Sequence, residues 1–139
     1  MKLSSSILYR IASVLLLLFA AGHTLGFRAT KPEWGVDALI SSMRTIHFDV
    51  QGFNRSYWDF FVGFGLFVTV FLLFAAVLAW QLGGASRETL HQLAGITWSL
   101  AITFFGITVV CYLYIFMVPI IFAAVITLCL ILAAWSAGK

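Results

Sequence analysis

Charged residues are scarce in this sequence. Asp, Glu, Lys and Arg together make up 9% of the 139 residues, whereas hydrophobic residues make up 63%. A soluble domain carries about 25% charged residues, and a disordered chain combines high charge with few apolar residues. Both classes are therefore excluded, and an integral membrane protein remains. The chain also lacks a basic run, so its net charge of +3 does not indicate a nucleic-acid partner.

Cysteine is equally scarce, with only two residues. Cys111 and Cys129 lie far apart in apolar stretches, which excludes a disulfide framework, a zinc-ligand spacing and a redox cysteine pair. The short run Gly63-Phe64-Gly65 lacks the third glycine of a dinucleotide-binding loop. A haem held by two histidines needs both at one depth on facing helices, and the three histidines of this chain are not spaced that way. We therefore expect no cofactor.

The sequence is rich in long apolar runs. A helix needs about 20 apolar residues to cross the hydrocarbon of a bilayer, and the first two runs of this kind cover residues 7–27 and 58–82. The first run resembles a secretory signal peptide, with Ala20-Ala21-Gly22 as a small-residue cleavage site. Because the apolar run continues through Leu25 and Phe27, we predict a helix that is retained.

The second half of the chain has no charged residue between Leu93 and Trp135, which is too long a stretch for one crossing. Tyrosines favour the membrane interface and proline suits the first turn of a helix, so the chain is expected to fold back between Tyr112 and Pro119. The third and fourth spans are therefore predicted at residues 90–114 and 119–135.

Ser86 is the predicted N-cap of the third span, with Thr89 in place of the usual Glu three residues later. Four spans with neither a β pattern nor an internal repeat predict an all-α fold. We expect an integral membrane four-helix bundle that forms a single domain over residues 1–139.

Residues 28–56 form the longest polar connection. Thr30-Lys31-Pro32-Glu33 fits a capping box. The apolar residues that follow are spaced by three and four, as in an amphipathic helix: Val36, Leu39, Ile40, Met43, Ile46 and Val50. This helix is expected to lie in the membrane interface between spans one and two, with Trp34 as an anchor. Gln51-Gly52-Phe53-Asn54 would then turn the chain into the second span.

Lys and Arg residues are divided evenly between the two sides of such a bundle. The first helix usually sets the orientation, which favours both termini in the cytoplasm and residues 28–56 outside. We therefore expect a multi-pass protein of the cell (inner) membrane. Its expected partners are the lipid bilayer, a lipid or quinone ligand, and further copies of the chain in a homo-oligomer.

Ionisable residues inside apolar helices are functional hypotheses by default. His23 lies four residues before the end of the first span, and Asp59 lies near the start of the returning second span. We predict that the two are neighbours in one leaflet and share a proton or a hydrogen bond. Gly22 or Gly26 would then face Gly63. The pair is either a buried tie between helices or a group that handles a proton or anchors a ligand.

Other polar and aromatic side chains would complete a site around this pair. The residues expected to bind a ligand or to form the rim of its pocket are His23, Arg55, Tyr57, Trp58, Asp59, His47 and Tyr112. A metal site built from His23, His47, Asp49 and Asp59 would have suitable ligand types, but the sequence defines no spacing for it. No metal is therefore predicted.

Three segments carry a resemblance to a known family. Gly22-His23-Thr24-Leu25-Gly26, Arg55-Ser56-Tyr57-Trp58-Asp59-Phe60 and Gly63-Phe64-Gly65-Leu66 together resemble a family of small uncharacterised bacterial four-span membrane proteins, loosely similar to the DoxX-like proteins. The resemblance implies the same four-helix membrane architecture and carries over no catalytic residues.

Three classes of function stay open. The favoured one is a protein that binds a lipophilic ligand or a membrane partner near the outer ends of spans one and two. The alternative is a membrane-embedded enzyme that uses His23 and Asp59 as acid and base on a lipophilic substrate. The third is a transporter protomer, which would need to oligomerise to form a path. The 14 phenylalanines suit an apolar ligand and lipid contact alike.

Overall fold

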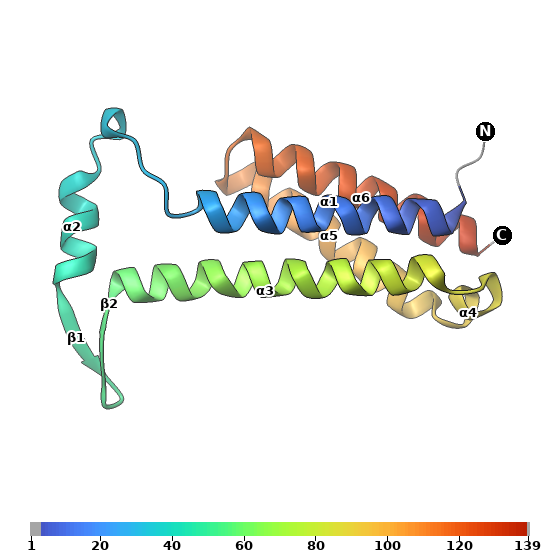
Figure 1. Cartoon of the computed structure of the whole chain (residues 1–139), viewed down its shortest axis with the longest axis horizontal. Coiled ribbons are helices and arrows are strands. Elements are labelled where there is room, and N and C mark those ends of the chain that lie inside the picture. Colours follow the sequence, from blue (N-terminus) through green and yellow to red (C-terminus); the bar gives the residue numbers. More distant parts are fainter. Residues whose placement is uncertain (1–3, 139) are drawn as a thin grey trace. The chain divides into compact units, whose positions relative to one another are not determined.

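The computed structural model describes residues 4–138, and most of them are helical (Figure 1). The long helices are α1 (Ser5–Gly26), α3 (Tyr57–Gly84), α5 (Ala94–Tyr114) and α6 (Met117–Ala137). The short elements are η1 (Pro32–Trp34), α2 (Asp37–Thr45), β1 (His47–Val50), β2 (Phe53–Ser56) and α4 (Arg87–Gln92). The predicted all-α helical bundle is confirmed as the fold class.

The four long helices are each long and apolar enough to cross a membrane. Their bounds lie within four residues of the predicted spans. Large apolar side chains on their surfaces are exposed, among them Phe67 and Phe74 of α3 and Ile102 of α5. Because so much exposed apolar surface is uncommon in soluble monomers, these helices are compatible with a multi-pass membrane protein.

The described residues fall into two compact units. One unit contains the described residues up to Phe19 together with those from Leu72 onward, and the other contains Ala20–Phe71. The division crosses α1 and α3, so each of these helices contributes one part to each unit. The single domain expected over residues 1–139 stays a prediction.

In the first unit, the helices meet through small and hydroxyl-bearing side chains. The Ser13 hydroxyl, which is buried, donates a hydrogen bond to the carbonyl oxygen of Ala76 at 2.8 Å and joins α1 to α3. The hydroxyl oxygens of Thr108 and Thr127 lie 3.0 Å apart between α5 and α6. Small residues let helix backbones approach closely, and interhelical hydroxyl contacts add stability in an apolar medium.

The turn between the second and third spans forms as expected at its start. The Thr89 amide donates a hydrogen bond to the Ser86 hydroxyl oxygen at 3.1 Å, which confirms Ser86 as an N-cap. The helix that it caps is the short α4, which ends at Gln92. Leu93 interrupts the helix, so the third span begins at Ala94 and the prediction of a start at Leu90 is wrong.

The third and fourth spans are separated where the sequence predicts. Ile115 and Phe116 have extended backbones between α5 and α6. Pro119 lies in the first turn of α6, where its missing amide N–H removes no helical hydrogen bond. The uncharged second half of the chain therefore folds back once, as two antiparallel helices that lie side by side (Figure 1).

The second unit contains a β-hairpin that the sequence analysis did not predict. β1 and β2 pair in antiparallel fashion, with His47 opposite Ser56. Gln51 and Gly52 have φ values of 51° and 85°, and a two-residue turn with positive φ at both positions matches the twist of paired strands. The predicted absence of β structure is therefore wrong here, and Val50 belongs to β1 instead of an amphipathic helix.

The start of the connecting segment also differs from the prediction. η1 follows Lys31, and no side chain caps it, so the capping box expected at Thr30 is absent. Lys31 Nζ instead lies 3.8 Å from a carboxylate oxygen of Glu33. Both side chains are exposed, and exposed ion pairs contribute little to stability.

Candidate functional site

His23 lies in the last turn of α1 and contacts α3 within the second unit. Its Nε2 atom is 3.0 Å from the carbonyl oxygen of Gly65. A carbonyl oxygen only accepts hydrogen bonds, so Nε2 carries the proton that it donates. One residue later, the hydroxyl oxygen of Thr24 lies 2.9 Å from that of Thr69. Two polar contacts therefore hold this end of α1 against α3.

Gly65 allows a phenylalanine ring to approach the α3 backbone. A Cβ atom added at Gly65 would lie 2.3 Å from Cε2 of Phe27, which is closer than real Cβ contacts. The Phe27 ring is also stacked on the His23 imidazole, with centroids 5.1 Å apart and planes 13° apart. The absence of a side chain at Gly65 is therefore a requirement of this packing.

The predicted glycine seam does not form. Gly22, Gly26 and Gly63 each have open space where a Cβ atom would lie. The close approach of α1 and α3 in this unit occurs at Gly65 instead. The expectation that Gly22 or Gly26 faces Gly63 is therefore wrong.

Asp59 caps its own helix. Its Oδ2 atom accepts hydrogen bonds from the Ser56 amide at 2.8 Å and from the Ser56 hydroxyl at 3.0 Å. The Asp59 amide in turn donates to the Ser56 hydroxyl oxygen at 3.3 Å. This reciprocal arrangement is a capping box in which aspartate replaces the usual glutamate. It fixes the position of the carboxylate at the start of α3.

His23 and Asp59 therefore have separate partners. Gly65, which accepts from His23, lies six residues beyond Asp59, and six residues correspond to about 9 Å along a helix. Within residues 4–138, no hydrogen bond or ion pair joins His23 to Asp59. The pair predicted to share a proton does not form.

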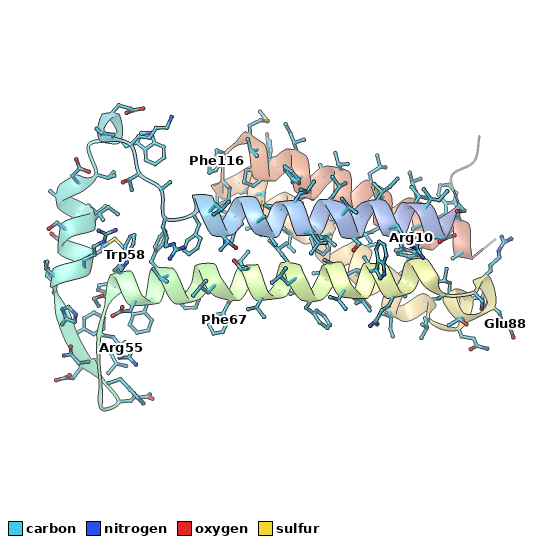
Figure 2. All side chains as sticks on the ribbon, in the orientation of Figure 1. Arg10, Arg55, Trp58, Phe67, Glu88 and Phe116 are labelled. Carbon is cyan, nitrogen blue, oxygen red and sulfur yellow. The ribbon has the colours of Figure 1, made fainter. Side chains whose placement is uncertain are left out.

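The segment before α3 is packed against the first turn of that helix by aromatic contacts. The Arg44 guanidinium lies 4.2 Å from the ring centroid of Trp58, a cation–π contact between α2 and α3. The Phe48 ring of β1 packs on Tyr57 and Phe60, with centroids 5.1 and 6.1 Å away. Figure 2 shows Trp58 and Arg55 where the hairpin meets α3.

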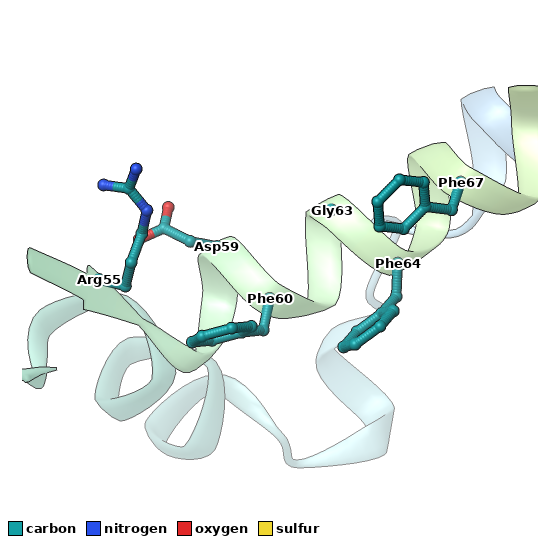
Figure 3. Close-up of a pocket in the computed structure, with 6 residues that line it drawn as sticks. All are labelled: Arg55, Asp59, Phe60, Gly63, Phe64 and Phe67. Atoms are coloured by element: carbon teal, nitrogen blue, oxygen red, sulfur yellow. The ribbon is translucent and has the colours of Figure 1, made fainter. Parts of the chain in front are cut away.

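A groove opens on α3 immediately after this junction (Figure 3). Its volume is about 150 Å³. The residues that line it are Arg55, Asp59, Phe60, Gly63, Phe64 and Phe67. Arg55 and Asp59 form a polar end, and the remaining residues recur at spacings of three and four, so they share one face of the helix.

Two of the predicted site residues, Arg55 and Asp59, line this groove. Tyr57 and Trp58 lie beside it without lining it, and Tyr112 belongs to the other unit. His47 is exposed, and its Nδ1 atom donates to the carbonyl oxygen of Thr45 at 3.0 Å.

The sequence analysis did not assign the apolar lining of the groove to the site. Phe60, Phe64 and Phe67 lie in the predicted span 58–82, and Gly63 in the predicted glycine seam, but none of the four was expected to line a pocket. Their spacing of three and four residues along the helix could have indicated the groove. This spacing places the three phenylalanines on one helix face that begins beside the charged Asp59.

The two charged residues of the groove are close enough to attract each other but form no direct ion pair. Within the described chain, the one ion pair is that of Lys31 with Glu33, so Arg55 and Asp59 form none. Arg55 Nη1 donates to the carbonyl oxygen of Asn54 at 2.8 Å. The side-chain hydrogen bonds of Asp59 use Oδ2, which leaves Oδ1 without a partner among residues 4–138. Each group therefore keeps hydrogen-bonding capacity for a ligand.

The described residues contain no group of three or more His, Cys, Asp or Glu side chains that could hold a metal ion. No protein-family model, no curated protein and no solved structure matches the chain. The chemistry of the site must therefore be inferred from its own residues.

Proposed function

We propose that this protein binds a lipophilic ligand in the groove at the start of α3. One observation supports the proposal above all others: the groove joins two oppositely charged side chains, which form no direct ion pair, to an apolar face that contains three phenylalanines. Small-molecule sites commonly combine an apolar lining with a few polar groups that orient the ligand. A molecule with a polar end and an apolar body matches this arrangement.

The surrounding contacts support a preformed site. Asp59 is held by its two hydrogen bonds from Ser56, and Phe60 is stacked on Phe48 with their ring planes 6° apart. Gly63 leaves open space between the aromatic side chains. Preformed sites bind more tightly because less conformational freedom is lost on binding.

The alternative function, an enzyme that uses His23 and Asp59 as acid and base, has less support. Such a mechanism needs both groups within hydrogen-bonding reach of one reacting bond. His23 donates from Nε2 to Gly65, a helix position about 9 Å further along α3 than Asp59. A binding function does not require His23 and Asp59 to reach the same bond.

The proposal places the protein in the cell (inner) membrane, with both termini in the cytoplasm and residues 28–56 outside. The groove would then open to the outer leaflet, where a lipid or a quinone could enter it from the bilayer. Assembly into a homo-oligomer is part of the same proposal.

Native mass spectrometry of the full chain, purified in a mild detergent, tests the proposal. We expect a bound apolar molecule in the wild-type protein and its loss in Gly63→Leu, because leucine would fill the open space at Gly63. Gly106→Leu is the matched control, since Gly106 is an equally open glycine on the apolar helix α5. Equal ligand retention in both variants, or no bound molecule in the wild type, would contradict the proposal. The same spectra give the number of protomers.

A further inference from the structure

The charged residues of the groove indicate the class of ligand that it binds. This inference rests on the proposed function. We propose that the groove binds a phospholipid with a zwitterionic headgroup that carries a primary ammonium, as in phosphatidylethanolamine. Arg55 and Asp59 line the same end of the groove with opposite charges, and they form no ion pair with each other. A headgroup that carries both signs complements both side chains at once.

Arg55 provides the donors for the phosphate. Its guanidinium has five N–H donors in a planar fork that suits phosphate oxygens. One nitrogen, Nη1, donates to the carbonyl oxygen of Asn54. The ring centroid of Phe53 lies 5.3 Å from the guanidinium carbon, a second contact that orients the group. The side chain is exposed, so its remaining N–H groups are accessible to a headgroup.

Asp59 provides the acceptor for the ammonium. Ser56 holds Oδ2 with two hydrogen bonds, and Oδ1 accepts none from the described residues. A primary ammonium has three N–H groups and can donate to Oδ1. A choline headgroup has no N–H group, so it lacks this hydrogen bond. An anionic headgroup without an ammonium would place like charge beside the carboxylate.

The phenylalanine face provides the surface for an acyl chain. Phe60, Phe64 and Phe67 follow one another along α3 from the charged end of the groove (Figure 3). The eight residues from Asp59 to Phe67 correspond to about 12 Å of helix. One leaflet of hydrocarbon is about 15 Å thick, half of the bilayer core. A chain that lies along this face would therefore stay within the leaflet of its own headgroup.

A quinone fits the same groove less well. Its ring carries no net charge, so it would leave both Arg55 and Asp59 without a charged partner. The zwitterionic lipid satisfies both groups, and a quinone is therefore an outcome to be tested against it.

A competition experiment tests the headgroup. The full-length protein, delipidated in detergent, is incubated with equal amounts of phosphatidylethanolamine, phosphatidylcholine and phosphatidylglycerol of matched acyl chains, and bound lipid is counted by native mass spectrometry. We expect phosphatidylethanolamine to be retained about tenfold more often than either of the others, which corresponds to about 1.4 kcal/mol. Equal retention of the three lipids, or a preference for phosphatidylglycerol, would overturn the headgroup assignment.

Two charge variants give the roles of the individual side chains. Asp59→Asn keeps an oxygen that can accept from Ser56 but removes the negative charge, so we expect the preference over phosphatidylcholine to disappear. Arg55→Gln should weaken retention of all three phosphate-bearing lipids, and Arg55→Lys should restore part of it. Circular dichroism and thermal unfolding establish that each variant is folded. Unchanged lipid selectivity in folded Asp59→Asn would also overturn the assignment.

The failure of this inference can be told apart from the failure of the proposed function. If Gly63→Leu abolishes retention while the three headgroups bind equally, or if a quinone is the molecule that co-purifies, the groove is a ligand site and the headgroup assignment is wrong. If Gly63→Leu and Gly106→Leu retain the same lipids as the wild type, both proposals are wrong.

Discussion

The Nε2 atom of His23 donates a hydrogen bond to the carbonyl oxygen of Gly65, 3.0 Å away, and thereby joins the end of α1 to α3. The same carbonyl oxygen also lies 3.3 Å from the Thr69 hydroxyl, which donates to it. A histidine in an apolar helix is often taken as a candidate for catalysis or metal binding. Here its polar edge is used by the backbone of a neighbouring helix, which is a structural role.

We therefore expect His23→Ala to lower the free energy of unfolding by about 0.5–1.5 kcal/mol, the usual net contribution of one hydrogen bond. His23→Gln should lose less, because its amide can still donate. His47→Ala is the control, since the His47 side chain is exposed and its Nδ1 atom donates to the nearby carbonyl oxygen of Thr45. Unfolding in detergent, followed by circular dichroism, measures the difference. Equal stability of the two alanine variants would show that the hydrogen bond of His23 to α3 does not stabilise the contact between the two helices.

Gly65 and Gly63 should respond in opposite ways to alanine. Gly65→Ala places a methyl group against the Phe27 ring, and overpacking of this kind costs about 1–3 kcal/mol. Gly63→Ala meets open space, and alanine in place of glycine within a helix is favourable by about 0.5–1 kcal/mol. The thermal unfolding midpoints of the two variants provide the measurement. A lower midpoint for Gly63→Ala than for Gly65→Ala would show that the packing at α1 and α3 is different.

The capping box of α3 can be tested at Ser56. Ser56→Ala removes the hydroxyl that accepts from the Asp59 amide, and loss of such an N-cap costs about 1 kcal/mol. Ser56→Gly should cost only a few tenths of a kcal/mol, because glycine is tolerated at this position. Chemical denaturation of both variants distinguishes these values. Indistinguishable losses would mean that Ser56 contributes through its burial instead of its hydrogen bonds.

The contact between Arg44 and Trp58 should stabilise α2 locally. An exposed cation–π pair contributes about 0.5–1 kcal/mol, so Arg44→Gln should increase the amide exchange of residues 37–45 by roughly two- to fivefold. Exchange in α5, which belongs to the other unit, is the internal reference. Hydrogen–deuterium exchange mass spectrometry gives both rates in one sample. Unchanged exchange in α2 would show that other contacts hold this helix.

The proposed orientation makes a topological prediction. A fluorescent protein fused after Lys139 should fluoresce, because it would fold in the cytoplasm, and alkaline phosphatase at the same position should be inactive. A phosphatase inserted at Gly52, at the tip of the hairpin, should be active. The opposite pattern would place both termini outside and residues 28–56 in the cytoplasm.

The long helices could be predicted from the sequence because length and hydropathy determine membrane-spanning helices almost alone. The turn capped by Ser86 and the break at Ile115–Phe116 also follow from local chemistry, although the start of the third span was predicted at Leu90, four residues before α5 begins. The hairpin was missed because residues 46–50 are too few to separate a period of two from a period of 3.6. The sequence predicts a turn at Gln51-Gly52 but does not predict the two strands that the turn connects.

The site was harder to predict, because it depends on how each helix is rotated about its own axis. Successive helix residues are about 100° apart, so Gly63 and Gly65 lie on different faces although they are close in sequence. Hydropathy cannot distinguish them, since every face of α3 is apolar. For the same reason, the placement of His23 and Asp59 in one leaflet could not reveal the separate partners that they bind.

The capping boxes illustrate a second limit. Both Thr30–Glu33 and Ser56–Asp59 have suitable side chains at the right spacing, but only the second forms. Ser56-Tyr57-Trp58-Asp59 directly precedes a long apolar helix, whereas Thr30 precedes a single turn of 3₁₀ helix. The motif is therefore a better predictor when a long helix follows it.

The contact between Phe27 and Gly65 has an evolutionary consequence. The ring occupies the volume that any side chain at position 65 would need, so a substitution there requires the Phe27 ring to move or to be replaced by a smaller side chain. Homologues with Ala or Ser at position 65 should carry a smaller residue, such as Leu or Val, at position 27. Homologues that keep Phe at position 27 should be invariant at position 65. Covariation of positions 27 and 65 in an alignment of homologues would indicate that this contact is kept as the sequences diverge.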